Sequence, residues 1–360
     1  LWMGSQLQTV DHQTASQILG LPLDRIRLNT VLAGGSFGRR AQPDAHVVRE
    51  IAEVAKAAGN GAYKLLHTRE DDIRGGYYRP LTVHRLRGGL DEAGNIVAWD
   101  DTIANQSIVA GTPFEMLMKD GIDATSVEGS TKMPYAWPAH RVSWARMEAG
   151  VPVLWWRAVG HTHTGHATEV FLDELLEKGG QDRVEGRLAL LKDAPRDRGV
   201  LERVAEMAAW QGPRGSNGRA YGVALHESFE TYVAMIAEVS DDGGRPRVHK
   251  VWAAVDCGLA VNPDIIRAQI EGGVGFALSA ALHSEIVLEE GGTVRQGNYD
   301  TFRIIGIDEM PEVEVEIVPS AEPPKGIGEP GVPPLSPAVV NAWRALTGET
   351  PRRLPLIRGS

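Results

Sequence analysis

A single carboxylate stands among glycines and a proline in the stretch 325–331 (KGIGEPG). The glycines reach backbone angles closed to other residues, and Pro330 fixes the chain directly after Glu329. A helix is predicted to follow, with Ser336 as N-cap and Pro337 as its first residue. The stretch thus predicts a rigid loop that aims the Glu329 side chain, although a surface turn with a solvated glutamate fits the same residues.

Composition narrows the classes of protein that remain. A length of 360 residues allows two domains with cores of their own. The net charge of −10 argues against nucleic acid as a partner, because such binding relies on basic patches. With Cys257 as the one cysteine, an internal disulfide and a cysteine-ligated iron–sulfur cluster are both excluded. No apolar run is expected to reach the length of a membrane span.

Apolar periodicity predicts alternating helical and extended segments. Helices are expected over 14–19, 47–58, 169–178, 183–191 and 200–209, and again after the N-cap and proline at 262–263. Strands are expected over 26–32, 63–67, 81–90, 96–102, 222–225, 232–239, 248–255, 283–288, 293–298 and 313–318. Residues 104–150 are less periodic and are interpreted as loops with short helices.

A glycine-rich loop, 33–40 (AGGSFGRR), separates a predicted strand from a predicted helix. Backbone N–H groups exposed at a helix start suit a phosphate or another oxyanion, and two arginines follow. The loop matches neither the dinucleotide fingerprint nor the Walker pattern. A tight structural turn therefore remains an equal alternative.

Two further clusters invite a functional interpretation. His161, His163 and His166 are closely spaced, but no carboxylate or cysteine completes a zinc pattern, so a metal site is not favoured. Gly272 and Gly273 lie inside a predicted helix, where each glycine costs roughly 1 kcal/mol relative to alanine. Their presence indicates close packing against another backbone or a flat cofactor.

Five motifs occur together in a recognisable order: 34–38 (GGSFG), 156–160 (WRAVG), 255–263 (VDCGLAVNP), 269–272 (QIEG) and 328–330 (GEP). Their order and separation resemble the molybdenum-binding part of the xanthine dehydrogenase and aldehyde oxidase family. The similarity is greatest to its isoquinoline 1-oxidoreductase beta-subunit branch, also described as membrane-bound aldehyde dehydrogenase large subunits. It covers roughly the C-terminal half of such a catalytic subunit.

The resemblance implies an α+β fold with mixed sheets and packed helices that binds molybdopterin without a direct protein ligand to molybdenum. Residues 1–160 would form part of a first molybdopterin-binding domain. Residues 161–360 would form a second, with a helical insert near 165–210. The cytosine dinucleotide form of the cofactor is compatible with this branch.

By the same resemblance, Glu329 is the general base that removes a proton from the water-derived oxygen that attacks the substrate, and Arg157 lies beside the metal. The remaining positions that match the cofactor region of the family are Gln6, Gly35, Phe37, Gly38, Gln269, Gly272 and Gly273.

The chain also departs from the family pattern. Ser36 replaces a common third glycine, and residues 39–41 (RRA) stand where purine hydroxylases have Gly-Lys-Glu. Xanthine is therefore not the expected substrate. The Gly-Gln-Gly segment that wraps the pterin is not found, which is why the chain is interpreted as one part of a longer subunit.

The predicted function is that of a molybdenum hydroxylase which oxidises an aldehyde or hydroxylates an N-heteroaromatic with water as oxygen source. The expected partners are the N-terminal half of the catalytic subunit and a small 2Fe–2S subunit, with a cytochrome c as a compatible acceptor. The alternatives are a non-catalytic homologue or assembly fragment that binds a partner chain without molybdenum, and a phosphate- or nucleotide-binding domain. Substrate and compartment, periplasm or cytoplasm, stay open.

Overall fold

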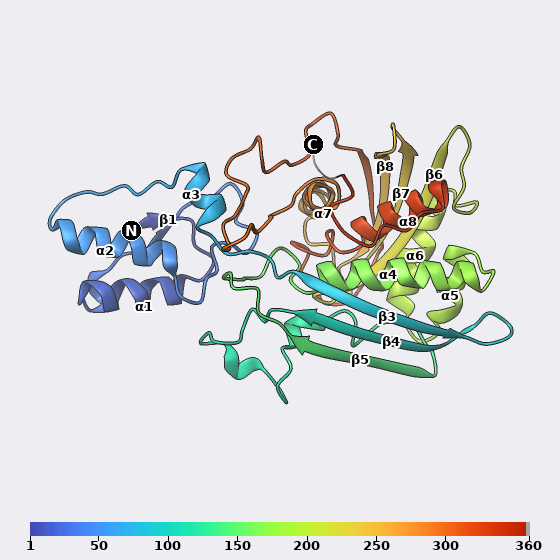
Figure 1. Ribbon diagram of the computed structural model, residues 1–360, viewed down its shortest axis with the longest axis horizontal. Coiled ribbons are helices and arrows are strands. Elements are labelled where there is room, and N and C mark those ends of the chain that lie inside the picture. The colour runs from blue at the N-terminus through green and yellow to red at the C-terminus, as the bar shows by residue number, and fades with distance from the viewer. Residues whose placement is uncertain (358–360) are drawn as a thin grey trace.

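The computed structural model describes residues 1–357 as an elongated body with the amino-terminal segment at one end (Figure 1). The elements of this segment are β1 (Trp2–Met3), α1 (Gln8–Leu19), β2 (Asn29–Thr30), α2 (His46–Ala58) and α3 (Arg69–Arg74). Helices α1 and α2 were both predicted, and each is followed by a glycine, Gly20 and Gly59, at its C-terminal end. A small apolar core of its own lies between them.

One predicted strand of this segment is shorter than expected, and another is wrong. Within 26–32, only Asn29–Thr30 forms a ladder, in parallel with Trp2–Met3, and Leu32 is fully exposed. Residues 63–67 lie outside every strand of the described chain. Apolar alternation produces a strand only where a neighbouring backbone supplies hydrogen bonds. Residues 26–32 pair only with the short segment 1–3, through the N–H groups of Asn29 and Val31, and residues 63–67 make no backbone hydrogen bond within the described chain.

A three-stranded sheet follows, formed by β3 (Thr82–Leu90), β4 (Ile96–Asn105) and β5 (Ala139–Arg146). The β3–β4 hairpin is confirmed, and Gly94 supplies the positive φ of its turn. Strand β5 pairs with β4 in parallel and was missed, because the whole of 104–150 was expected to be loop and short helix. It is a largely exposed edge strand, so no buried face marks it in the sequence. Two short 3-10 turns precede it, Glu115–Leu117 and Ala124–Ser126.

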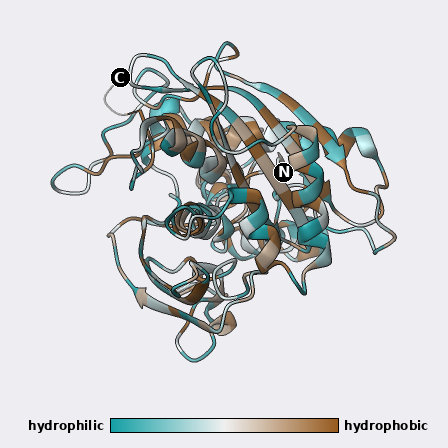
Figure 2. Cartoon of the chain, turned by 90° about the vertical axis from the view of Figure 1, so that its right-hand side faces the viewer, coloured by the Kyte–Doolittle hydropathy of each residue, from teal (hydrophilic) through white to brown (hydrophobic). Residues whose placement is uncertain are grey.

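The second sheet has the order β6-β7-β8-β9, all antiparallel except the β8–β9 pair. Its strands are β6 (Arg219–Ser228), β7 (Thr231–Asp241), β8 (Pro246–Asp256) and β9 (Glu312–Ile317). Along β7, Val233 and Met235 belong to one apolar cluster, and Ala234 and Ile236 belong to another. Both faces of this sheet are therefore covered, which explains the continuous apolar run in the middle of β7, whereas β9 alternates glutamate with apolar residues (Figure 2).

Helices lie on both sides of the second sheet (Figure 1). They are α4 (His161–Lys178), α5 (Arg183–Leu190), α6 (Pro195–Met207), α7 (Pro263–Leu282) and α8 (Leu335–Thr347). One cluster joins the sheet to α7 and α8, and the other joins it to α4, α5, α6 and the first sheet. Mixed sheets and packed helices confirm the expected α+β class.

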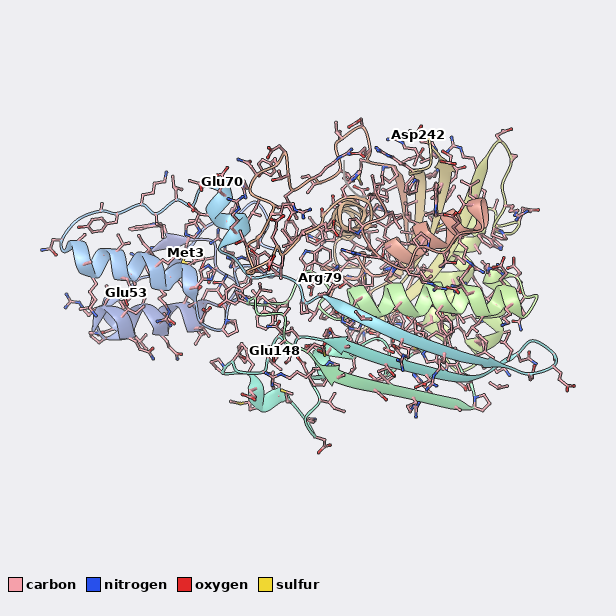
Figure 3. The ribbon with its side chains drawn as sticks, in the orientation of Figure 1. Met3, Glu53, Glu70, Arg79, Glu148 and Asp242 are labelled. Atoms are coloured by element: carbon pink, nitrogen blue, oxygen red, sulfur yellow. The ribbon has the colours of Figure 1, made fainter. Side chains whose placement is uncertain are left out.

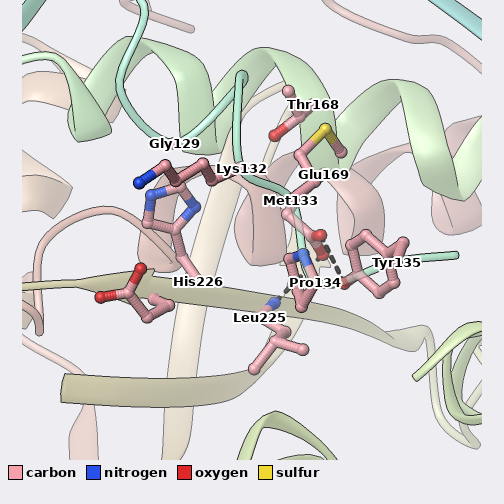
Figure 4. A pocket seen from close by; sticks show the side chains of 10 residues that line it. Gly129, Lys132, Met133, Pro134, Tyr135, Thr168, Glu169, Leu225 and His226 are labelled. Atoms are coloured by element: carbon pink, nitrogen blue, oxygen red, sulfur yellow. Dashed lines mark hydrogen bonds between the residues drawn. The ribbon is translucent and has the colours of Figure 1, made fainter. Parts of the chain in front are cut away.

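A buried polar network joins α4, α5 and β6 to the segment before β5, and Figure 4 shows its members Tyr135, Glu169 and Leu225. Glu169 accepts a hydrogen bond from the Tyr135 hydroxyl at 2.6 Å and one from the Leu225 N–H at 3.0 Å. Arg187, with no exposed surface, donates to Glu169 at 3.0 Å and to Asp173 at 3.2 Å. These charges offset one another, as burial of ionised groups requires.

Helix α7 begins as predicted, with the Asn262 side chain accepting the N–H of Ile265 at 3.2 Å. By length and composition alone it could cross a bilayer, so the expectation that no apolar run reaches this length is wrong. Its buried face packs against β9 and α8 and contributes to the core of the second sheet. The fold buries 44% of the most apolar window of α7.

Two helix starts that bear on the site, and one hairpin, differ from those predicted. Helix α4 begins at His161, eight residues before the expected start, and α8 begins at Leu335, so Ser336 is inside the helix and is not its N-cap. Ser336 Oγ lies instead 3.0 Å from Nδ1 of His166. The hairpin expected over 283–298 reduces to one isolated bridge, between Leu288 and Val294.

Candidate active site

Glu329 lies on the loop that joins β9 to α8, and its carboxylate reaches a second segment of the chain. Oε1 accepts a hydrogen bond from the backbone N–H of Ala158 at 2.9 Å. The N–H of Val332 donates to the Glu329 carbonyl at 3.0 Å, and Pro330 between them is buried. The loop is therefore tied to the body of the protein rather than free in solvent.

Packing of this loop on α7 depends on Gly273. A Cβ atom at that position would lie 3.0 Å from the carbonyl carbon of Gly331, a separation that the two backbones cannot relieve easily. Gly272 is exposed, and a Cβ atom there would meet no heavy atom within 4 Å. Close approach to another backbone thus explains Gly273, whereas Gly272 faces open space.

Arg157 connects three segments around Glu329. Its Nε–H donates to the Gly328 carbonyl at 2.7 Å, and Nη2 donates to Gln269 at Oε1, 3.0 Å away, and at the backbone carbonyl, 3.3 Å away. The residue is 6% exposed, and this burial lowers the pKa of the guanidinium, while the charge of Glu329 opposes the shift. Arg157 therefore holds the loop against α7 and places a positive charge beside the carboxylate.

An aromatic stack lies next to Arg157. The Phe37 ring packs on that of Phe276 with centroids 4.7 Å apart, and Trp156 packs on Phe276 at 4.4 Å. The Arg157 guanidinium lies 5.6 Å from the Phe37 centroid, and that of Arg79 lies 4.8 Å from the Trp156 centroid. Arg79 marks the place where the chain passes from the amino-terminal segment into the first sheet (Figure 3).

The glycine-rich loop is shaped to approach this stack. Gly35 and Gly38 have φ of 114° and 98°, and even Phe37 adopts a φ of 53°. A Cβ atom at Gly38 would lie 3.0 Å from the Trp155 carbonyl oxygen, and the indole N–H of Trp155 donates to the Gly38 carbonyl at 3.1 Å. The loop is thus seated on the segment that carries Arg157.

The backbone N–H groups of residues 34–38 donate no hydrogen bond within the described chain. Successive N–H groups on a backbone with positive φ angles form a concave donor site for oxygen atoms. Gln6 lies at the end of this loop, where its Oε1 accepts the N–H of Arg40 at 3.3 Å. This donor set fits the oxygen-rich cofactor that the sequence resemblance implies.

Each of the three clustered histidines contacts another side chain of the protein. His161 Nδ1 lies 2.9 Å from Nε2 of His226, and His163 Nδ1 lies 2.9 Å from Nε2 of His84. Burial lowers the pKa of His161 and of His166 to about 4, so both rings are neutral at pH 7. Among the described residues, no group of three metal-ligating side chains comes together.

Sequence reasoning missed two features of this site. Phe276 belongs to an ordinary apolar helix face, and only the fold shows that its ring lies between Phe37 and Trp156. Glu128 lies in the stretch that was interpreted as loop, and its carboxylate accepts the N–H of Gly160 at 2.8 Å. Nothing in spacing or composition distinguishes Glu128 from a solvated glutamate.

Comparisons with known sequences agree with this geometry. Residues 1–190 and 171–311 each match a molybdopterin cofactor-binding domain. The chain is 30% identical to isoquinoline 1-oxidoreductase subunit beta of Brevundimonas diminuta, over 99% of this chain and 46% of that protein. It is 29% identical to membrane-bound aldehyde dehydrogenase of Gluconacetobacter polyoxogenes, over 98% and 49%. The chain therefore spans about half the length of these curated relatives.

Solved structures show the same fold at much lower identity. Quinoline 2-oxidoreductase from Pseudomonas putida 86 superimposes with a TM-score of 0.80 at 13% identity, over 99% of this chain and 71% of that one. The Cu,Mo-CO dehydrogenase superimposes with a TM-score of 0.75 at 14% identity, over 96% and 69%. With its two domain matches and its relatives, the chain belongs to the xanthine dehydrogenase family of molybdopterin cofactor-binding proteins.

Proposed function

We propose that this chain carries the catalytic site of a molybdenum hydroxylase, an oxidoreductase that oxidises an aldehyde or hydroxylates an N-heteroaromatic with water as the oxygen source. One observation carries the proposal. The Glu329 carboxylate is fixed by the N–H of Ala158 directly beside the buried cation of Arg157, whose hydrogen-bond partners are neutral. A fixed base next to a charge not consumed by another ion pair suits a reaction in which a proton is removed and negative charge develops.

The cofactor, when bound, supplies the two-electron oxidation and a site for the water-derived oxygen. The N–H groups of Gly35, Phe37 and Gly38, together with the amide of Gln6, are donors that would hold its oxygen atoms. Gln269 keeps Arg157 in place, and Gly272 leaves room for a group that approaches α7.

Glu329 and the aromatic rings would act on the substrate. Glu329 accepts the proton released as the oxygen bonds to the substrate carbon. The stacked rings of Phe37, Phe276 and Trp156 supply apolar surface beside Arg157. Such a surface excludes water and would pack against a planar aldehyde or heteroaromatic ring.

The wider assembly is also part of the proposal. An N-terminal half of the catalytic subunit would complete the cofactor site, and a small 2Fe–2S subunit would take the electrons onward, with a cytochrome c as a suitable acceptor. We assign residues 1–160 to the first molybdopterin-binding domain and 161–360 to the second, with the helical insert near 165–210. The cytosine dinucleotide form of the cofactor fits the relatives' branch of the family.

The decisive test is Glu329→Gln in the complete protein. The amide preserves the size of the side chain, so molybdenum content is expected to stay near wild type. Loss of a general base typically costs about 10²- to 10⁴-fold, and anaerobic reduction of the molybdenum centre by substrate should slow by that order. Glu322→Gln, an exposed glutamate of the same segment, is the matched control and should reduce at the wild-type rate.

Two results would refute the proposed function. Rapid reduction in Glu329→Gln would show that Glu329 is not the base. Wild-type protein without stoichiometric molybdenum, prepared from a host that makes the cofactor, would favour the non-catalytic homologue instead.

A further inference from the structure

A second carboxylate, that of Glu128, is bound to the same backbone turn that holds Glu329. The Gly160 N–H donates to Glu128 Oε1 at 2.8 Å, and the Ala158 N–H, two residues earlier, donates to Glu329 Oε1 at 2.9 Å. Ala158 and Val159 adopt φ of 72° and 49°, an uncommon conformation for residues with a β-carbon. Both carboxylates are therefore fixed to one short, rigid piece of backbone.

Among residues 1–357, which the structure describes, no cation forms an ion pair with Glu128. The titratable groups that face it are Asp123, Glu329 and His161, whose Nε2 lies 3.7 Å from Glu128 Oε2. His161 is neutral at pH 7, because burial lowers its pKa to about 4. Burial, and then the negative charges of Asp123 and Glu329, raise the pKa of Glu128 to about 7, although the Gly160 hydrogen bond opposes the shift.

We propose that Glu128 is the second proton-accepting group of this site, which takes the proton that Glu329 collects in each turnover and releases it to solvent. The inference rests on the proposed function of Glu329 as the base. In the transfer, the Glu329 carboxylic acid loses its proton and becomes a carboxylate, and the Glu128 carboxylate gains that proton. Glu128 acts through Glu329 and does not touch the reacting atoms.

The arrangement favours this exchange for two reasons. Two neighbouring carboxylates in a partly desolvated site resist being ionised together, so a proton arriving on one is readily shared with the other. The Glu128 side chain is also 27% exposed, which leaves it a route for exchange with water. Glu329 is thereby returned to its basic form for the next turnover.

The pair can be tested without turnover by infrared titration of the complete, cofactor-free protein. Burial also raises the pKa of Asp197 to about 7, so the signal of Glu128 is the difference between wild type and Glu128→Gln, which should be one carboxyl group that titrates near pH 7. In Glu329→Gln, where a neighbouring negative charge is removed, the same group should titrate at lower pH. If this group titrated at the same pH in Glu329→Gln as in wild type, the proposal would be overturned. Glu128 itself is unchanged in this variant.

The kinetic test compares steady-state turnover of wild type and Glu128→Gln across pH. Glutamine resembles a permanently protonated Glu128, so the two proteins should converge below about pH 6. Above pH 7 the variant should fall behind, by up to ~10²-fold, the lower end of what a proton-transfer group contributes. Glu92→Gln, in the exposed β3–β4 turn, is the control and should follow wild type at every pH.

A wild-type-to-variant ratio that is the same at every pH would mean that Glu128 is merely structural. A different result would refute the proposed function: Glu329→Gln would retain rapid reduction of the molybdenum centre. The infrared titration would still report whether the two carboxyl groups interact.

Discussion

Two buried arginines show how partners decide what a charged side chain does. Arg187 has no exposed surface and is neutralised by Glu169 and Asp173, which hold the pKa of its guanidinium above the usual value. Arg157 is nearly as buried, but its hydrogen bonds go to carbonyl and amide oxygens. The charge of Arg187 is thus satisfied within the core, whereas that of Arg157 is available to Glu329 and to a ligand.

We expect Arg157→Lys to destabilise the protein and to loosen the Glu329 loop. An ammonium group cannot reach Gly328 and Gln269 together in the planar geometry of a guanidinium. Each lost hydrogen bond to a charged donor costs about 1.5–3 kcal/mol. Equilibrium urea unfolding of the complete protein measures this free energy.

The same change at an exposed arginine is the control for that measurement. Arg352 makes a bidentate ion pair with Glu174 at 2.6 and 2.7 Å on the surface, so Arg352→Lys should change the free energy of unfolding by less than about 1 kcal/mol. Equal changes in the free energy of unfolding for Arg157→Lys and Arg352→Lys would contradict the conclusion that Arg157 holds the Glu329 loop against α7.

At the scale of elements, the site depends on α7 and the Glu329 loop being in direct contact. Helix α7 carries glycines where alanine would be a better helix former, and only one of the adjacent pair at 272–273 is explained by packing within the chain. The contact between Gly273 and Gly331 sets how closely the loop approaches the helix, and hence where Glu329 stands relative to Arg157.

Alanine at these adjacent glycines should have opposite effects. Gly273→Ala would force a methyl group to 3.0 Å from the Gly331 backbone and is expected to cost about 1–3 kcal/mol, as overpacking does. Gly272→Ala meets no neighbour and should stabilise the cofactor-free protein by up to ~1 kcal/mol through helix propensity. Thermal unfolding of both variants, each compared with wild type, measures the difference.

The two alanine variants should also differ in how much cofactor they bind. If Gly272 faces the bound group, Gly272→Ala should reduce molybdenum content despite the more stable fold. Destabilisation by Gly272→Ala in the cofactor-free protein would show that the space beside Gly272 is filled by the chain itself.

At the scale of the whole molecule, the candidate site is assembled from segments far apart in the sequence. The glycine-rich loop belongs to the amino-terminal segment, Arg157 lies just before α4, and Glu329 lies just before α8. Under the proposed function, these three segments would form one wall of the cofactor cavity, and the rest of the subunit would supply the others.

Residues 1–360 expressed alone are expected to retain little molybdenum. The donors described here face only one side of a cofactor that also carries pterin and phosphate groups. Co-expression with the remainder of the subunit should restore stoichiometric molybdenum, measured by elemental analysis against protein concentration. Full loading of residues 1–360 alone would show that this wall is sufficient.

Local signals in the sequence predicted the elements whose residues bury a regular face. Helices α1, α2 and α7, the β3–β4 hairpin and strands β6 to β9 were all expected, because their caps, turns and apolar periods are encoded within a few residues. Segments whose structure depends on a distant partner were predicted less well: 63–67 and β5 were mistaken, and the strand within 26–32 is shorter than predicted. Their pairing or lack of it is decided elsewhere in the chain.

The same division holds for the site. The sequence by itself pointed to Glu329, Arg157 and the glycine-rich loop, since a carboxylate or an arginine among motifs of fixed order is visible in one dimension. Only the tertiary structure placed Phe276 between two other rings and tied Glu128 to the turn that holds Glu329. The reason is physical: burial, repulsion between charges and ring stacking depend on distances in space, which sequence separation does not determine.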